Sequence, residues 1–209
     1  MTATLLGSKE NNYGGQICGN MTSGRTESIL LAVKTSHDYM KSKKGITRPE
    51  MIIPLSGNSA YEKVVQYFNI KLWRVPVDKN FQADVKAIRR HINKNTILEL
   101  GRLASSFGIS FHVDLCLGGF VLQFARELGY LIPPYDFSVK GVSSISVDVH
   151  KYGLAPKGAS IVLYRNHEIR KPKPISVPLS GKVPLSGECA SLFFPSAAIL
   201  PLSGPPVTF

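Results

Sequence analysis

The chain has 209 residues, 44% of them apolar, which is enough for one domain with a core and too few for two large ones. Lysine and arginine outnumber aspartate and glutamate by 25 to 14, so the formal net charge of +11 favours an anionic partner: a phosphorylated small molecule, nucleic acid or an acidic membrane surface. Three cysteines without metal-type spacing indicate neither a disulfide framework nor a zinc site, so we expect no metal. We expect a soluble chain, because no stretch reaches the roughly 18 apolar residues of a transmembrane helix and no signal-peptide pattern follows Met1.

The first block of the chain, residues 1–97, is predicted to alternate helices and strands. Gly24 precedes Thr26, Glu27 and the apolar run Ser28–Val33, so a glycine loop is expected to open a helix. Further along, short apolar runs predict two strands, and a basic amphipathic pattern predicts a helix after them. These segments are Met51–Leu55 and Ile70–Val77 for the strands and Asp84–Asn93 for the helix. The predicted order is helix, strand, helix, strand, helix.

The second block, residues 98–170, continues this alternation. Its predicted elements are a helix over Leu98–Phe107, a strand over Ile109–Leu115, a helix over Gly119–Leu128, and strands over Ser143–Val149 and Ser160–Tyr164. Strands that alternate with helices favour a mostly parallel sheet with helices on both faces, so the fold class is predicted to be α/β.

The last block, residues 172–209, has a different composition. The sequence Pro-Leu-Ser-Gly occurs three times, beginning at positions 178, 184 and 201, and proline and glycine interrupt any helical or strand period. We expect this low-complexity tail to be largely disordered. Its apolar piece Ala190–Leu200 is too short to cross a bilayer, so a sticky segment is favoured over an anchor.

The predicted strand Ile109–Leu115 carries the first candidate site residue at its end. A period of two places His112, Asp114 and Cys116 on one face of this strand. Open α/β sheets bind ligands beyond the carboxyl ends of their strands, so Asp114 is a candidate cofactor ligand. The alternative is an aspartate that caps the glycine turn after it, and taken alone this alternative is favoured.

Lys151 follows the predicted strand Ser143–Val149, in which Ser146 and Asp148 share a face with His150. Two strands therefore bring polar groups to one edge of the sheet. With its pKa lowered by desolvation beside His150, Lys151 could act as a nucleophilic amine that forms a Schiff base. The alternative is an exposed lysine in a turn.

The loop from Met21 to Glu27 combines hydroxyl side chains, Gly24 and a following helix N-terminus. Backbone N–H groups and the helix dipole accommodate a phosphate at such a position, although Thr22 or Ser23 could simply cap the helix. A phosphate loop, a strand-end aspartate and a strand-end lysine, in this order, are what pyridoxal phosphate requires. The phosphate is anchored, the pyridine nitrogen is kept protonated by the carboxylate, and the aldehyde is held by the amine.

Four stretches extend this pattern into a specific resemblance: GNMTSGRTESILLAVK, MIIPLSGNSAYEKVVQYFNIKLWRVPVD, FHVDLCLGGF and ISVDVHKYGLAPKG. They resemble the sphingosine-1-phosphate lyase family in a plant-like version, over nearly all of residues 1–171. The resemblance implies that residues 1–171 are the large domain of a fold-type I, transferase-like pyridoxal-phosphate enzyme. It further implies a homodimer that cleaves a phosphorylated long-chain base into a fatty aldehyde and phosphoethanolamine.

The same resemblance implies roles for individual residues. Lys151 would hold the cofactor as a Schiff base, and Asp114 would pair with the pyridine nitrogen. The residues expected around the phosphate are Gly24, Thr26 and His150. In the implied retro-aldol cleavage the substrate amine displaces Lys151, and a base takes the C3 hydroxyl proton as the C2–C3 bond breaks. Lys157 is either a second catalytic lysine that serves the substrate phosphate or a surface lysine.

Four departures from the family pattern bear on catalytic competence. Arg25 stands where the family's TSGGTES loop has its second glycine, so its side chain either blocks the loop or supplies a guanidinium for the phosphate, and we favour impairment. Asn58, at the cofactor, stands where the SGHSAY pattern has a stacking histidine. Between Ile97 and Leu98 the family has a further strand and turn, so we expect an incomplete sheet: the loss leaves two strands without ladder partners and forces the sheet either to close up or to open. The tail is expected to stand in place of a small C-terminal domain, and we expect the chain to lack the family's N-terminal membrane anchor.

These departures leave two hypotheses, an active lyase and a catalytically dead truncated relative, such as a pseudogene or mis-spliced product, with at most a binding role. Restoring Arg25→Gly and Asn58→His is expected to improve cofactor binding little unless the missing strand is also restored. The family implies the cytosolic face of the endoplasmic reticulum membrane, and a chain without the anchor is expected in the cytosol. Nucleic acid is not expected as a partner, because the basic helix lacks interleaved aromatic residues.

Overall fold

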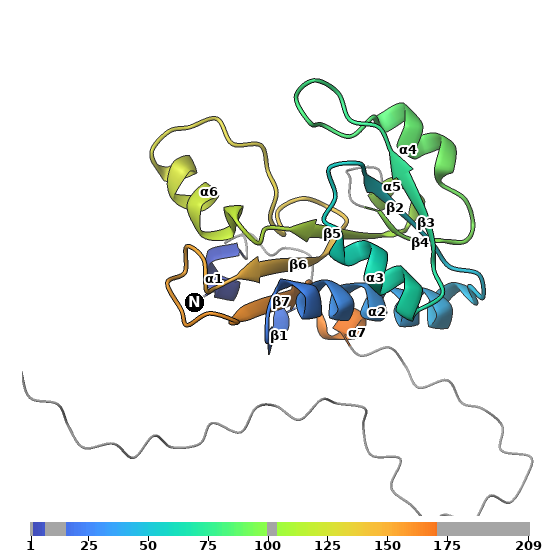
Figure 1. Ribbon diagram of the computed structural model, residues 1–209, viewed down its shortest axis with the longest axis horizontal. Helices are drawn as coiled ribbons and strands as arrows, with labels where there is room; N and C mark the ends of the chain where they lie inside the picture. Colours follow the sequence, from blue (N-terminus) through green and yellow to red (C-terminus); the bar gives the residue numbers. More distant parts are fainter. Residues whose placement is uncertain (1, 7–15, 100–103, 171–209) are drawn as a thin grey trace, which may run out of the picture. The chain divides into compact units, whose positions relative to one another are not determined.

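The computed structural model describes residues 2–6, 16–99 and 104–170, which all fall in the first of two units of the chain, Met1–Ile175. They form a seven-stranded sheet with helices on both faces (Figure 1). The strands are β1 (Cys18–Thr22), β2 (Glu50–Pro54), β3 (Lys71–Val75), β4 (Thr96–Glu99), β5 (Ser110–Asp114), β6 (Val142–Asp148) and β7 (Ser160–Tyr164). The helices are α1 (Thr2–Leu6), α2 (Arg25–Lys44), α3 (Ala60–Tyr67), α4 (Val85–His91), α5 (Ala104–Phe107), α6 (Gly118–Glu127) and α7 (His167–Arg170). The predicted tail, 172–209, lies outside the described residues.

The strand order is β1-β7-β6-β5-β4-β2-β3, and most of the sheet is parallel. The five strands β3, β2, β4, β5 and β6 run parallel to one another, whereas β7 is antiparallel to both β6 and β1. A parallel strand covered on both faces is buried throughout, and every residue of β6 is buried. The predicted mostly parallel α/β fold is confirmed.

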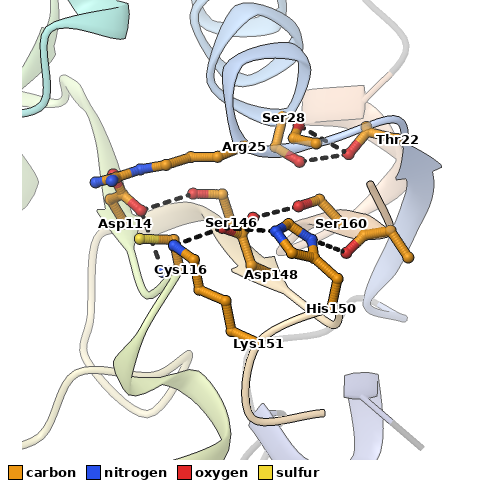
Figure 2. A network of polar contacts seen from close by, with 12 residues as sticks. Thr22, Arg25, Ser28, Asp114, Cys116, Ser146, Asp148, His150, Lys151 and Ser160 are labelled. Carbon is orange, nitrogen blue, oxygen red and sulfur yellow. Dashed lines mark hydrogen bonds and ion pairs between the residues drawn. The ribbon is translucent and has the colours of Figure 1, made fainter. Parts of the chain in front are cut away.

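The alternation of side chains along the strands divides the core between the two faces of the sheet. In β2, Met51 and Ile53 pack with α2 and α3, whereas Ile52 packs with α4. In β6, Ile145 and Val147 pack into the cluster that also contains residues of α1 and α6. The other face of β6 therefore presents Ser144, Ser146 and Asp148 on the side of α2, where the candidate site lies (Figure 2).

The predicted helix over Leu98–Phe107 is wrong in its first part. Thr96–Glu99 forms β4, Ala104–Phe107 forms the short helix α5, and residues 100–103 lie outside the described residues. Ile97 and Leu98 are both fully buried, as expected of a strand covered on both faces. Such a short apolar run has no alternation that separates a buried strand from a buried helix, so its period is uninformative.

Of the two outcomes expected where the family's further strand is missing, the described residues show the first: the sheet closes up. β4 lies between β2 and β5, where Leu98 is in register with both Met51 and Ser110. Neither neighbouring strand is left without a ladder partner. The segment at the junction itself therefore closes the sheet, and it does so with a glutamate, Glu99, whose side chain is fully buried.

Two elements at the start of the chain were not predicted, namely α1 and β1. β1 contains Gly19 and Asn20, which are poor strand formers, and its position depends on antiparallel pairing with β7, from Cys18 opposite Tyr164 to Thr22 opposite Ser160. Tertiary pairing therefore determines this strand more than its own sequence does. Within the described residues, no helix has both the length and the apolar character to cross a membrane.

Candidate active site at the ends of two neighbouring strands

The candidate site lies where β5 and β6 end side by side. The two strands are parallel, and Asp114 at the end of β5 is in register with Ser146 of β6. Lys151 follows β6 by three residues, and Figure 2 shows its amine on the same side of the sheet as the Asp114 carboxylate. The prediction that these two strand ends meet at one edge of a mostly parallel sheet is confirmed.

The carboxylate of Asp114 is held by the guanidinium of Arg25. Arg25 donates to Asp114 Oδ2 from Nε at 3.1 Å and from Nη2 at 2.7 Å. The other oxygen, Oδ1, accepts from the backbone N–H of Cys116 at 3.2 Å and from the Ser146 hydroxyl at 3.4 Å. Burial is the largest single influence and opposes the charge of Arg25, but the hydrogen bond to Asp114 and the negative charge of Asp114 together outweigh it and raise the pKa of Arg25 above the usual value. The bond to Cys116 shows that Asp114 also serves the turn after β5, as the capping interpretation proposed.

Lys151 is paired with Asp148, a residue that the sequence analysis placed on a face with Ser146 and His150 but did not assign to the site. Its amine lies 2.8 Å from Asp148 Oδ2, and Asp148, which is only 2% exposed, also accepts a hydrogen bond from the Ser160 hydroxyl. The hydrogen bond to Asp148 raises the pKa of Lys151. The expected lowering of this pKa by desolvation is therefore wrong, because a buried anion within hydrogen-bonding distance outweighs the partial burial of the amine.

His150 lies beside Lys151 but faces the turn. Its Nδ1 is 2.7 Å from the carbonyl oxygen of Ala159, which requires a proton on Nδ1, and its Nε2 is 4.0 Å from Asp148 Oδ2. The backbone N–H of His150 also donates to the Ala159 carbonyl. His150 thus ties the loop between β6 and β7 to the end of β6.

The loop between β1 and α2 satisfies most of its hydroxyl groups internally. The hydroxyls of Thr22 and Ser28 are 2.6 Å apart, and Glu27 accepts from the backbone N–H and hydroxyl of Ser23 at 2.6 and 2.7 Å. Gly24 is the N-cap of α2 and receives no side-chain cap hydrogen bond, so the alternative in which Thr22 or Ser23 caps the helix is wrong. No atom lies within 4 Å of a Cβ built on Gly24, and Thr26 is exposed.

Two predicted site residues are not brought into contact with this pair of strand ends. Asn58 lies two residues before α3, where its side-chain oxygen accepts from the backbone N–H of Ala60 at 2.8 Å. Lys157 is exposed in the loop between β6 and β7. Within the described part of the chain, no hydrogen bond or ion pair joins either residue to Asp114 or Lys151.

Two residues that sequence reasoning did not assign to the site lie within it. The Cys116 thiol is hydrogen-bonded to Lys151, and burial, followed by the charge of Asp114, raises the pKa of this thiol. His112 is fully buried, with Nδ1 2.9 Å from the Ser144 hydroxyl and Nε2 3.2 Å from the Ser146 hydroxyl. Both residues share the predicted polar face with Asp114, which was the available signal.

Burial keeps His112 neutral and lowers its pKa to about 4. Because Ser146 also donates to Asp114, the chain His112–Ser146–Asp114 connects a buried imidazole to the carboxylate of the site. Tyr61 of α3 covers this network with an edge-on contact to the His112 ring. The base of the site is therefore shielded from water.

The residues present suit pyridoxal phosphate in kind and in relative position. A carboxylate and an amine lie at one edge of the sheet, and a glycine with open space above it precedes a long helix. In the state described, both functional groups already have partners of opposite charge, Arg25 on Asp114 and Asp148 on Lys151. If these two groups hold the cofactor, both ion pairs would have to open.

No family model matches the chain. It is 72% identical to sphingosine-1-phosphate lyase of Arabidopsis thaliana over 194 residues, covering 85% of this chain and 36% of that protein. It is 66% identical to the rice enzyme of the same name over 194 residues, again 85% of this chain and 36% of that protein. The chain thus spans about a third of the length of these curated relatives.

Solved structures are similar to the same part of the chain. The sphingosine-1-phosphate lyase of Burkholderia pseudomallei K96243 matches with a TM-score of 0.78 and 32% identity, over 81% of this chain and 44% of that one. A glutamate decarboxylase of Lactobacillus brevis matches with a TM-score of 0.68 and 23% identity, over 80% of this chain and 44% of that one. The second match shows the fold alone.

Proposed function

We propose, from the premise that this chain belongs to the sphingosine-1-phosphate lyase family, that it forms part of a pyridoxal-phosphate-dependent carbon–carbon lyase. The substrate would be a phosphorylated long-chain base, and the products a fatty aldehyde and phosphoethanolamine. The observation that carries the proposal is the placement of Asp114 and Lys151 at the ends of two neighbouring parallel strands. The matches to the plant sphingosine-1-phosphate lyases support it. A site of this type belongs beyond the carboxyl ends of strands.

Within this proposal each residue has a stated task. Lys151 would hold the cofactor's aldehyde, Asp114 would keep the pyridine nitrogen protonated, and Gly24 would leave room for the phosphate. Thr26 and His150 would complete the phosphate end, Asn58 would lie at the cofactor, and Lys157 would serve the substrate phosphate. When bound, pyridoxal phosphate supplies an electron sink for the bond that breaks.

The first task of the protein's own residues is a proton transfer. The raised pKa of Lys151 means that its amine is protonated at neutral pH, and an ammonium group is not nucleophilic. The amine must leave Asp148 Oδ2 and lose a proton before it can react. The nearest titratable groups that face it are Asp148, the Cys116 thiol and, beyond Asp148, the His150 imidazole.

A catalytically dead relative with at most a binding role is the second candidate, and one observation favours it. Arg25 occupies the carboxylate that would pair with the cofactor nitrogen. If that ion pair does not open, the chain cannot hold the cofactor in a productive position.

A product assay separates the two candidates. The chain would be incubated with pyridoxal phosphate and a phosphorylated long-chain base, and the long-chain aldehyde measured by mass spectrometry. We expect aldehyde from the wild type and from Lys86→Ala, which changes an exposed lysine of α4, and none from Lys151→Ala. Absence of aldehyde from wild-type protein that still retains the cofactor would support the dead relative.

The proposal includes two features of the family that concern assembly and location. We propose a homodimer, and an exposed apolar stripe along α6 supports association with another polypeptide. Its residues are Leu117, Val121, Phe124 and Leu128. We further propose that the enzyme acts in the cytosol or on the cytosolic face of the endoplasmic reticulum membrane, where an anionic lipid surface suits the net charge of +11. Nucleic acid is not among the proposed partners.

A further inference from the structure

We propose that Arg25 is an internal competitor of the cofactor: its guanidinium occupies the acceptor on Asp114 that the pyridine nitrogen requires, and cofactor binding has to displace it. This inference rests on the proposed function, because it assigns to Asp114 the role of nitrogen partner. It adds a residue that controls cofactor affinity without contributing to the reaction.

The hydrogen-bonding capacity of the Asp114 carboxylate carries the argument. An ionised carboxylate has about four lone-pair positions, two on each oxygen. Both positions on Oδ2 are taken by Arg25, at 3.1 Å from Nε and 2.7 Å from Nη2. The backbone N–H of Cys116 and the hydroxyl of Ser146 take Oδ1. A further donor, such as a pyridinium N–H, can bind only if one of these four leaves.

Arg25 is the donor that can leave most easily. The Cys116 N–H belongs to the turn after β5, and Ser146 lies in the fully buried strand β6, so neither can move without disturbing the sheet. The Arg25 side chain is 29% exposed and rotates about single bonds. Displacement of Arg25 would leave the two hydrogen bonds on Oδ1 intact, together with the orientation of the carboxylate.

The position of Arg25 in α2 also weakens the hold on its guanidinium. Arg25 is the first residue of the helix, where the helix dipole disfavours a cation. The acid of the first turn, Glu27, is directed to Ser23 and not to Arg25. The groups that face the guanidinium are Asp114, the Cys116 thiol and the Tyr61 hydroxyl, and among them Asp114 provides the ion pair. The cation is thus held at an unfavourable helix position by one carboxylate.

The test measures the affinity of the full chain for pyridoxal phosphate by absorbance titration, with borohydride reduction to locate the bound lysine. We expect Arg25→Ala to bind pyridoxal phosphate about tenfold more tightly than the wild type, which is the effect of roughly 1.4 kcal/mol of competition. Arg25→Lys keeps the positive charge but loses the bidentate hydrogen-bond donor, so its affinity for pyridoxal phosphate should lie between those of the wild type and Arg25→Ala. The matched control is Arg126→Ala, which breaks the similarly exposed ion pair with Asp136 and should leave the affinity unchanged.

A cofactor analogue makes the test specific for the pyridine nitrogen. In 1-deazapyridoxal phosphate a carbon replaces that nitrogen, so the analogue cannot use the carboxylate that Arg25 releases. The gain in Arg25→Ala should therefore be found with pyridoxal phosphate and be absent with the analogue. An equal gain with both compounds would overturn the inference and indicate simple steric relief.

The outcomes separate this inference from the proposed function. If wild type and Arg25→Ala both form an adduct at Lys151 with equal affinity, the proposed function stands and the competition is overturned. Weaker binding by Arg25→Ala would also overturn it, because the guanidinium would then serve the cofactor phosphate. No adduct at Lys151 in any variant would overturn the proposed function together with the competition. A cooperative thermal unfolding transition in each variant checks that the fold is retained.

Discussion

The amine of Lys151 and the carboxylate of Asp148 lie 2.8 Å apart, three residues from one another at the end of β6. This pairing defines the resting state of the candidate nucleophile. Replacing Asp148 by Asn removes the anion that raises the pKa of Lys151, so the unprotonated amine should become available at lower pH. The rate of reductive trapping of pyridoxal phosphate, measured against pH, should shift its midpoint downward in Asp148→Asn. An unchanged midpoint would show that Asp148 does not control this amine.

The same ion pair has a consequence for stability at alkaline pH. A lysine whose folded pKa is raised contributes stability that is present below its unfolded value near 10.5 and is lost as pH rises through the folded value. Wild-type protein should therefore lose stability more steeply than Lys151→Ala above pH 10.5, measured by urea denaturation. Parallel curves for the two proteins would contradict this expectation.

Buried His112 predicts acid sensitivity of the fold. Its pKa is lowered to about 4 from the usual value of 6.5, so between these values the unfolded chain binds more protons than the folded one. Stability therefore falls as pH drops from 6.5 towards 4, by up to about 3 kcal/mol from this residue. His112→Asn should flatten the dependence of unfolding free energy on pH, whereas His167→Asn, which changes an exposed histidine, should not. Identical slopes in the wild type and His112→Asn would refute the assignment.

The Cys116 thiol is expected to react slowly with alkylating reagents. It is 5% exposed, and burial together with the Asp114 charge raises its pKa, so little thiolate is present at neutral pH. Mass spectrometry after iodoacetamide treatment at pH 7.5 should find Cys116 labelled at least about tenfold more slowly than in urea-unfolded chain. Equal rates would mean that the site is open in solution.

The strand β4 can be tested directly, because it replaced a predicted helix. Ile97→Ala removes a fully buried side chain and should lower the unfolding free energy by about 2–5 kcal/mol. Val85→Ala, at a position that is 54% exposed, should change it by less than about 0.5 kcal/mol. Slow amide hydrogen exchange at Leu98 and Glu99 would confirm the ladder bonds with β2 and β5. Fast exchange at both amides would show that the sheet is open at this position.

The fold and the position of the site follow from local patterns in the sequence, and the contacts within the site do not. A period of two put His112 and Asp114 on one face of their strand, and Ser146 and Asp148 on one face of theirs. Parallel pairing of the two strands places these two polar faces on the same side of the sheet. The ion pair of Arg25 with Asp114 joins residues 89 positions apart. It depends on how far a long side chain reaches across the sheet edge, which no spacing rule gives.

The prediction that point reversions alone improve cofactor binding little also depended on an incomplete sheet. With β4 between β2 and β5 the sheet closes up within the described residues, and the strands that end beside Asp114 and Lys151 are held in register, so the spacing of these two residues does not require the missing strand. The sequence left closing and opening as alternatives, since Thr96–Glu99 has a period compatible with either a strand or a helix. We accordingly expect Arg25 to limit cofactor binding more than the junction does.

The most direct test of the central claim is to locate the lysine that binds pyridoxal phosphate. The full chain would be equilibrated with the cofactor at pH 8, reduced with borohydride, digested and mapped by mass spectrometry. The site described here predicts a pyridoxyl group on Lys151 in near-stoichiometric amount, loss of that group in Lys151→Ala without transfer to Lys157, and weaker labelling in Asp114→Asn. Labelling spread over exposed lysines such as Lys86 and Lys157, with Lys151 no more modified than they are, would contradict it.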